Sequence, residues 1–282
     1  MILQPSLTQG FACPWTKSAD IANPQAWYSN VGAWCPMLGM QGGTLYDWSG
    51  NHMHGTLTNM DLNADWVVTG WPAVSLAGTN QYVNLGNSSL NPNADDFTID
   101  LFAKFPDVNA ASPILTKRQS TSPFAQISLY QGTANASGTI TASKKISFFF
   151  IQDGSNSKWG HTTNDVVNGE WHDIAVRIYD GDGSWDLVID GKTAAKTMTR
   201  SLGSPSVSNS ATWQIGRDNA SSYGAFTLGS CSLFRKALTD SELAKRRLAL
   251  YEVRDRSAVA DAVAAGGMPM LAMNQYRNAG AL

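Results

Sequence analysis

The sequence predicts an all-β protein, a two-sheet antiparallel sandwich with an extended N-terminal arm and short C-terminal helices. Strand-like runs fill residues 41–237 with no helical pattern between them, which is typical of a sandwich. Residues 97–105 place apolar side chains at every second position, as a half-buried strand does. Asp190-Gly191 directly follows a run that ends at Ile189, and such a pair predicts a hairpin because both turn positions need φ > 0.

Further runs have the composition of strands. They are residues 81–85, 124–130, 146–152, 172–179, 185–189, 212–216 and 225–234. One of them contains Phe148-Phe149-Phe150-Ile151, which does not alternate with polar residues. This pattern predicts a strand that is covered on both faces.

The chain divides into three zones. Residues 1–40 contain several prolines and tryptophans; they are too proline-rich for regular structure and too aromatic for a disordered tail, so we expect an extended arm. Residues 41–250 form the sandwich. Residues 251–282 form a C-terminal helix and tail, with an Ala-rich helical stretch over 257–265. Just before them, Thr239 and Glu242 have the spacing of a capping box and predict the start of a short helix.

Composition narrows the choice of partners. Of 282 residues only 15% are charged and the formal net charge is -2, which argues against nucleic acid and anionic membranes. The first residues lack the pattern of a secretory signal, and no window of 18 apolar residues exists. Cys13, Cys35 and Cys231 lack metal-site spacing. A Cys13–Cys35 disulfide stays open, but reduced thiols and synthesis in a reducing cytoplasm are favoured.

Three stretches carry a family resemblance. They are residues 45–57 (LYDWSGNHMHGTL), residues 168–176 with 185–192 (NGEWHDIAV and WDLVIDGK), and residues 233–243 (LFRKALTDSEL). In this order they resemble the opening turn, the central hairpin and the last strand with closing helix of laminin-G-like or pentraxin-like domains. The resemblance implies a concanavalin A-like jelly roll. It implies no single function, because this fold carries lectins, adhesins, enzymes and capsid parts.

Few residues of the sequence have the spacing of a metal or catalytic site. Some relatives bind Ca²⁺ with the opening turn, where Asp47 and Asn51 match, but the last strand here lacks their usual carboxylate. His54 is expected to stabilise the turn rather than to bind zinc. The only three glutamates, Glu170, Glu242 and Glu252, are not paired as in glucanases.

One acidic cluster stands apart, at Asp180, Asp182 and Asp186. It flanks glycines, which predicts a solvated turn. We therefore expect no enzyme activity, and no cofactor apart from the calcium candidate.

Sugar is the usual ligand of the family, and sugar sites combine aromatic rings with polar donors. Trp159 and Tyr223 lie in or near loops, and Asn219 belongs to the loop that reads most like a lectin's. These three residues are the candidate ligand-binding set. The alternative for both rings is packing in the core, which is the commoner role of aromatics at strand ends.

Two functions fit the sequence. The first is a virion structural protein, a phage head decoration or tail-associated protein. A fold typical of cell surfaces without an export signal favours it, as do arms suited to binding major capsid or other virion proteins. Such a protein would form a homo-oligomer, with a trimer most natural, and could touch host glycans. The alternative is a carbohydrate-binding or adhesion module of a bacterial surface protein.

Overall fold

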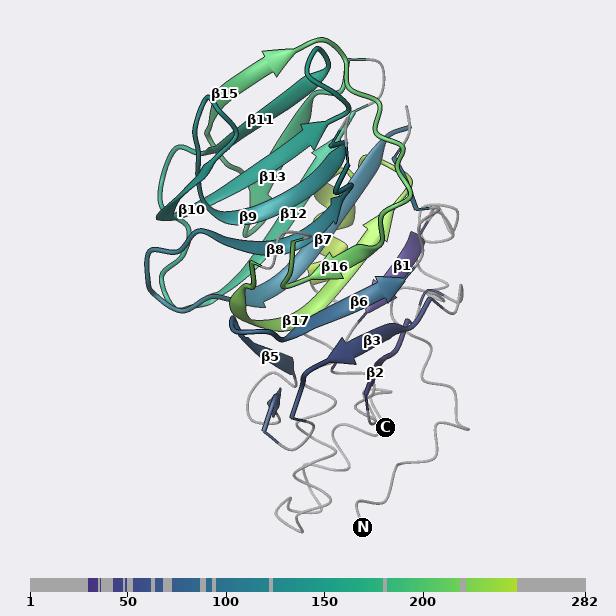
Figure 1. Cartoon of the computed structure of the whole chain (residues 1–282), viewed down its shortest axis with the longest axis vertical. Coiled ribbons are helices and arrows are strands. Elements are labelled where there is room, and N and C mark those ends of the chain that lie inside the picture. Colours follow the sequence, from purple (N-terminus) through teal and green to yellow (C-terminus); the bar gives the residue numbers. More distant parts are fainter. Residues whose placement is uncertain are drawn as a thin grey trace.

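The computed structural model describes residues 30–34, 36, 43–47, 49, 53–61, 64–67, 73–86, 90–92, 95–121, 124–179, 182–218 and 222–247. These residues form two antiparallel sheets packed face to face (Figure 1), which confirms the predicted jelly-roll sandwich. All the expected strands are present, with ends shifted by a few residues at most positions. No helix among the described residues is long and apolar enough to cross a membrane.

The first sheet has eight strands. Their order is β14 (Lys192–Thr193), β13 (Trp185–Ile189), β12 (Trp171–Ile178), β7 (Phe97–Lys104), β17 (Ala225–Phe234), β5 (Ala73–Ala77) and β4 (Trp66–Val67), with β1 (Asn30–Trp34) also paired to β17. Asp190 and Gly191 have φ of 50° and 76° between β13 and β14, so the predicted hairpin turn is confirmed.

The second sheet has nine strands. Their order is β15 (Lys196–Leu202), β11 (Ser157–Thr162), β10 (Ile140–Ile151), β9 (Gln126–Ala134), β8 (Ser112–Arg118), β16 (Trp213–Ile215), β6 (Tyr82–Gly86), β3 (Gly55–Thr58) and β2 (Thr44–Leu45).

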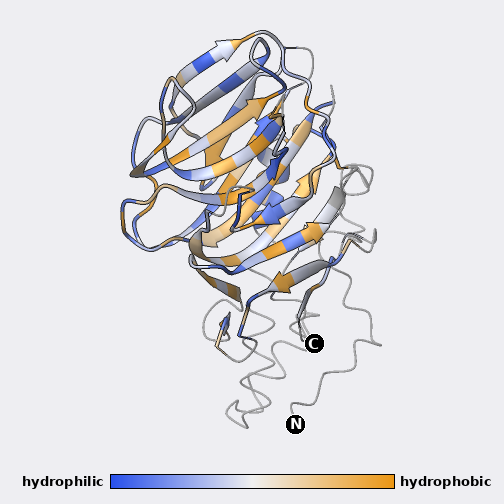
Figure 2. Cartoon of the chain, viewed as in Figure 1, coloured by the Kyte–Doolittle hydropathy of each residue, from blue (hydrophilic) through white to orange (hydrophobic). Residues whose placement is uncertain are grey.

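The core lies between the sheets, and its side chains come from alternate positions of the strands. Figure 2 shows hydrophobic and hydrophilic residues alternating along several of these strands. Trp34, Trp185 and Trp213 are its largest rings, and Trp213 stacks on Phe97 with ring centroids 6.4 Å apart. Lys117 is also buried, with its Nζ donating to the Ala211 carbonyl, and burial lowers its pKa to about 8.

A helix over residues 240–247 covers the outer face of the eight-stranded sheet. Its capping box is confirmed, because the Thr239 N–H donates to Glu242 Oε2 at 2.9 Å and the Glu242 N–H donates to Thr239 Oγ1 at 3.3 Å. Leu238 and Leu243 pack on Phe234 and its neighbours in the sheet. Hydrophobic burial therefore fixes this helix to one side of the sandwich only.

One expectation needs correction. Residues 30–34, assigned to the N-terminal arm, form β1 within the eight-stranded sheet, because their backbone pairs with the last strand. In the same sheet, Trp171 stacks on Phe102 on the outer face, with centroids 4.8 Å apart. Residues 1–29 and 251–282, which include most of the arm and the whole expected tail, lie outside the described residues.

Candidate functional site

The outer face of the nine-stranded sheet carries a continuous line of paired residues. Strand register places them side by side across all nine strands, and their sequence neighbours point into the core. From β15 to β2 they are Arg200, Trp159, Phe149, Ser128, Thr116, Gln214, Asn84, Thr56 and Thr44. We call Arg200 to Phe149 the aromatic half and Ser128 to Thr44 the polar half.

The aromatic half is packed rather than open. Trp159 stacks on Phe149 at 5.8 Å, Tyr130 meets Phe149 edge-on, and the Trp159 Nε1–H donates to the Asn135 carbonyl at 2.9 Å. This small cluster confirms that the Phe148–Ile151 run is covered on both faces. Trp159 therefore lies on the candidate face, but its ring is only 6% exposed and cannot be an open stacking platform.

The polar half holds polar groups without partners. Gln214 is 9% exposed, yet its side-chain amide makes no hydrogen bond within the described structure. Arg217 has a buried Nε without a partner and forms no ion pair with a described residue. Its guanidinium lies over the rings of Tyr82 and Tyr223, at 4.6 and 5.7 Å from their centroids.

Residues 216–218 and 222–224 build this arrangement. The Thr116 hydroxyl donates to the Arg217 carbonyl at 2.7 Å, which holds this segment against β8. Asp218 then reaches Arg118 at 3.4 Å and the Tyr130 hydroxyl at 3.5 Å. Burial, followed by the charge of Asp218, raises the pKa of Tyr130, so its hydroxyl keeps its proton.

Of the predicted ligand-binding set, Trp159 and Tyr223 share this outer face, and Tyr223 is half-buried beside Tyr82 at a centroid distance of 6.4 Å. Asn219 lies outside the described residues. Sequence reasoning missed Gln214 and Arg217. Gln214 stands between the core residues Trp213 and Ile215, and this alternation was a usable signal.

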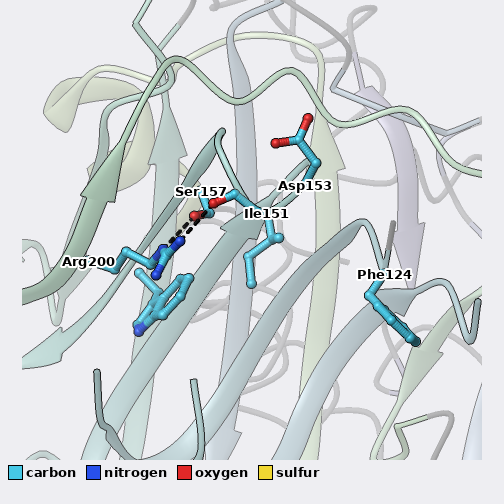
Figure 3. Close-up of a pocket in the computed structure, with 7 residues that line it drawn as sticks. Phe124, Ile151, Asp153, Ser157 and Arg200 are labelled. Carbon is cyan, nitrogen blue, oxygen red and sulfur yellow. Dashed lines mark hydrogen bonds between the residues drawn. The ribbon is translucent and has the colours of Figure 1, made fainter. Parts of the chain in front are cut away.

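An open pocket of about 520 Å³ lies at the other end of the face (Figure 3). Its lining residues are Phe124, Ile151, Asp153, Gly154, Ser157, Trp159 and Arg200. The Arg200 Cζ lies over the Trp159 ring, 4.9 Å from its centroid, and the guanidinium donates hydrogen bonds to Ser157 Oγ and the Gly154 carbonyl.

The predicted calcium ligand Asp47 has a different role. Its Oδ1 accepts hydrogen bonds from the N–H groups of Ala33 and Ser49, both at 2.9 Å, and its Oδ2 accepts from Ser49 Oγ and the Met53 N–H. Four donors fill the lone pairs that a Ca²⁺ ligand would need, so this carboxylate does not fit calcium. Asn51 lies outside the described residues, and the described part of the chain holds no cluster of three metal-ligating side chains.

His54 stabilises the opening turn, as expected. Its Nδ1 accepts a hydrogen bond from the Asp47 N–H at 3.0 Å, and its ring meets Tyr46 edge-on. The lone pair of one imidazole nitrogen is thus taken up by the backbone of the turn.

The acidic groups are also engaged in structure. Asp182 accepts a hydrogen bond from the Ser184 N–H at 2.6 Å in the predicted turn, and Asp186 pairs with Lys196 at 3.1 Å. Glu242 caps the helix. The buried pair Asp100 and Asp173 lies beneath the helix and binds Arg246 and Arg247. Asp180 and Glu252 lie outside the described residues.

Three solved structures illustrate what the chain is similar to. They are a sialidase of Trypanosoma rangeli with 2,3-difluorosialic acid (12% identity, 77% of this chain and 32% of that one, TM-score 0.53), the binding domain of Paraclostridial Mosquitocidal Protein 1 (14%, 76% and 50%, 0.52), and domain 4 of the arabinanase AbnA from Geobacillus stearothermophilus with arabinotriose (14%, 76% and 96%, 0.53). The chain thus spans about a third of the sialidase. At these identities the likeness shows the fold alone.

A comparison with curated proteins gave no match. A family model described as the concanavalin A-like lectin/glucanases superfamily matches residues 77–244, more than half of the chain. The match covers β6 to β17 and the first part of the closing helix, and so every residue of the outer-face line except Thr56 and Thr44. The chain therefore belongs to the concanavalin A-like lectin/glucanase superfamily.

Proposed function

We propose that the protein is a non-enzymatic carbohydrate-binding module and that sugar binds on the polar half of the nine-stranded sheet. One observation carries the proposal: Gln214 Oε1 and Arg217 Nε are buried without hydrogen-bond partners on the same outer face, and the Arg217 guanidinium lies over the rings of Tyr82 and Tyr223. Leaving a buried polar group unsatisfied costs about 1–3 kcal/mol, so a ligand that satisfies it gains that energy on binding.

A sugar has the matching chemistry. Each hydroxyl both donates and accepts, so it can serve the amide of Gln214 and the donors of Arg217 together. The half-buried ring of Tyr223 offers an apolar surface for the C–H face of a pyranose or furanose ring. Other orphan atoms, such as Ser230 Oγ on β17 and Trp185 Nε1 in the core, lie apart from this face.

The absence of enzyme activity belongs to the same proposal. Hydrolysis by this fold needs two carboxyl groups facing the scissile bond. Beside Arg217, residues 216–218 and 222–224 contain one carboxylate, Asp218, and it is held by Arg118 and Tyr130. This arrangement supports binding without cleavage.

The virion role stays a prediction from the sequence. It depends on the arms at residues 1–40 and 251–282, of which only residues 30–34 and 36 are described. The bacterial-surface and virion settings are both compatible with a sugar-binding face. The polar half therefore favours the carbohydrate-binding function over a purely structural one.

The test is a glycan array followed by calorimetric titration of the best neutral ligand. We expect Gln214→Ala and Tyr223→Ala each to weaken binding about tenfold or more, since each removes a direct contact. Ser230→Ala is the matched control, because it also removes a buried orphan group but lies on β17 in the other sheet. Binding by none of the arrayed glycans, or equal binding by all three variants, would contradict the proposal.

A further inference from the structure

The pocket in Figure 3 differs in chemistry from the polar half. Strands β10, β11 and β15 and the loop before β9 supply its walls, and it opens to solvent with a volume of about 520 Å³. That volume suits one sugar residue rather than a long chain. The charged group that dominates it is Arg200.

Arg200 is held in one orientation. Its Nε donates to Ser157 Oγ at 2.8 Å, its Nη2 donates to the Gly154 carbonyl at 2.7 Å, and its Cζ lies 4.9 Å from the Trp159 centroid. A register shift between β11 and β15 sets Arg200 opposite Trp159. Gly160 permits this shift, because a Cβ there would lie 2.4 Å from the Thr197 carbonyl oxygen.

The charge of Arg200 is not neutralised. It forms no ion pair with any acidic residue in the described part of the chain, and its Nη1 has no hydrogen-bond partner there. Asp153 also lines the pocket, but its carboxylate accepts the N–H groups of Ser155 at 2.7 Å and Asn156 at 2.8 Å in its own turn. Figure 3 shows this carboxylate turned away from the guanidinium.

The pocket also has apolar lining residues. Phe124 is 52% exposed and Ile151 is half-buried. Phe124 has φ of 58°, a left-handed conformation that is strained for an aromatic residue. Backbone hydrogen bonds from Phe124 to Thr121 and from Gln119 to Ala125 hold that strain in place. Such strain is concentrated at ligand-binding positions.

We propose that this pocket is a second subsite that selects an anionic sugar residue, with the anion on the free edge of Arg200 and the ring against Phe124. An oriented arginine fork matches the planar geometry of a carboxylate and also binds sulfate. The assignment rests on the proposed sugar-binding function and deepens it, because it adds charge selectivity that the polar half does not supply.

The test uses monosaccharides and the ¹⁵N-labelled protein. Glucuronate, glucose 6-sulfate and neutral glucose are titrated separately, and the Trp159 indole N–H signal reports on the pocket. We expect both anionic sugars to shift this signal at concentrations where glucose does not. Tighter binding of glucuronate than of the sulfate would identify the carboxylate as the natural anion, and the reverse would identify the sulfate.

Variants separate this subsite from the polar half. Arg200→Gln should weaken binding of the anionic sugars about tenfold or more, and Arg200→Lys should retain part of it, because charge remains but the fork is lost. Arg235→Gln, an exposed arginine at the end of β17, is the charge-matched control. Equal binding of glucose, or an unchanged anion affinity in Arg200→Gln, would overturn the assignment.

The two proposals fail in different ways. If Gln214→Ala loses neutral-sugar binding and Arg200→Gln does not change anion binding, the proposed function is supported and the second subsite is contradicted. If Arg200→Gln loses anion binding and Gln214→Ala does not change neutral-sugar binding, the pocket at Arg200 is supported and the sugar site on the polar half is contradicted.

Discussion

The two outer faces of the sandwich treat their charged and polar groups in opposite ways. On the eight-stranded sheet, the 240–247 helix brings arginines onto buried acids: Arg246 binds Asp100, and Arg247 Nε lies 3.1 Å from Asp173 Oδ2. On the nine-stranded sheet no described helix covers the face, and although Arg118 pairs with Asp218, Arg200 and Arg217 have no acidic partner among the described residues.

This difference indicates which of the two outer faces can bind a ligand. The charged groups of the eight-stranded face that have internal partners offer little to a ligand, because those partners already satisfy them, although Ser230 Oγ on that face has none. A face whose polar groups stay unpaired loses stability, and it recovers that energy only when a ligand satisfies them. The nine-stranded face therefore carries the proposed function, and the eight-stranded face anchors the chain's closing segment.

The largest expected effect comes from breaking the closed face. Asp100→Ala leaves the Arg246 charge buried without its acid, so the free energy of unfolding should fall by about 3–5 kcal/mol. Chemical denaturation measures it. A loss below about 1 kcal/mol would mean that the pair is no more than a surface ion pair, and the contrast between the faces would fail.

The second prediction concerns pH. Burial, and then the charge of Asp100, raise the pKa of Asp173 to about 8. The folded protein thus holds this proton more tightly than the unfolded chain, whose Asp pKa is about 4. The free energy of unfolding should therefore fall as pH rises from about 4 to about 8 and level off above that.

Asp173→Asn provides the check, because its amide resembles the protonated acid. Denaturation curves collected across this pH range give the free energy of unfolding, which should depend less on pH in the variant than in the natural protein. Lys117, whose pKa is also about 8, acts above this window and with the opposite sign, since its neutral form is favoured in the folded state. If the free energy of unfolding depends on pH equally in Asp173→Asn and the natural protein, Asp173 is not the cause of that dependence.

On the open face, Gln214→Leu should separate stability from binding. It replaces a buried amide that has no partner, so the free energy of unfolding should stay within about 1 kcal/mol or rise, while sugar binding is lost. Thermal unfolding and titration on one sample measure both quantities. A large destabilisation would show that Gln214 is a structural residue like those of the closed face.

The smallest expected effect is at Phe124. Phe124→Gly relieves its left-handed backbone and should raise the free energy of unfolding by about 0.5–1 kcal/mol, offset by little lost packing because the ring is 52% exposed. Phe124→Ala keeps the strain and serves as the comparison. Both variants should weaken binding of anionic sugars to the pocket, and a destabilised glycine variant would contradict the strain argument.

Local patterns were enough to predict much of this protein. Alternation of apolar residues placed strands such as β7 and β17, the Asp190-Gly191 pair predicted its hairpin, and Thr239 with Glu242 predicted the start of the helix. These features depend on neighbours within a few residues, and that is the information a single sequence contains directly.

Long-range pairing decided the rest. β1 belongs to the sandwich because its backbone pairs with β17, about 200 residues later in the chain. The register across nine strands places Gln214, Trp159 and Arg200 in one line. The same register buried Trp159 beneath Arg200. The approach of β1 and the fold of the opening turn supplied the donors that fill the lone pairs of Asp47. The residue types of the binding face could be guessed from the sequence, but which of them stay unpaired depends on strand register, and only the tertiary structure determines it.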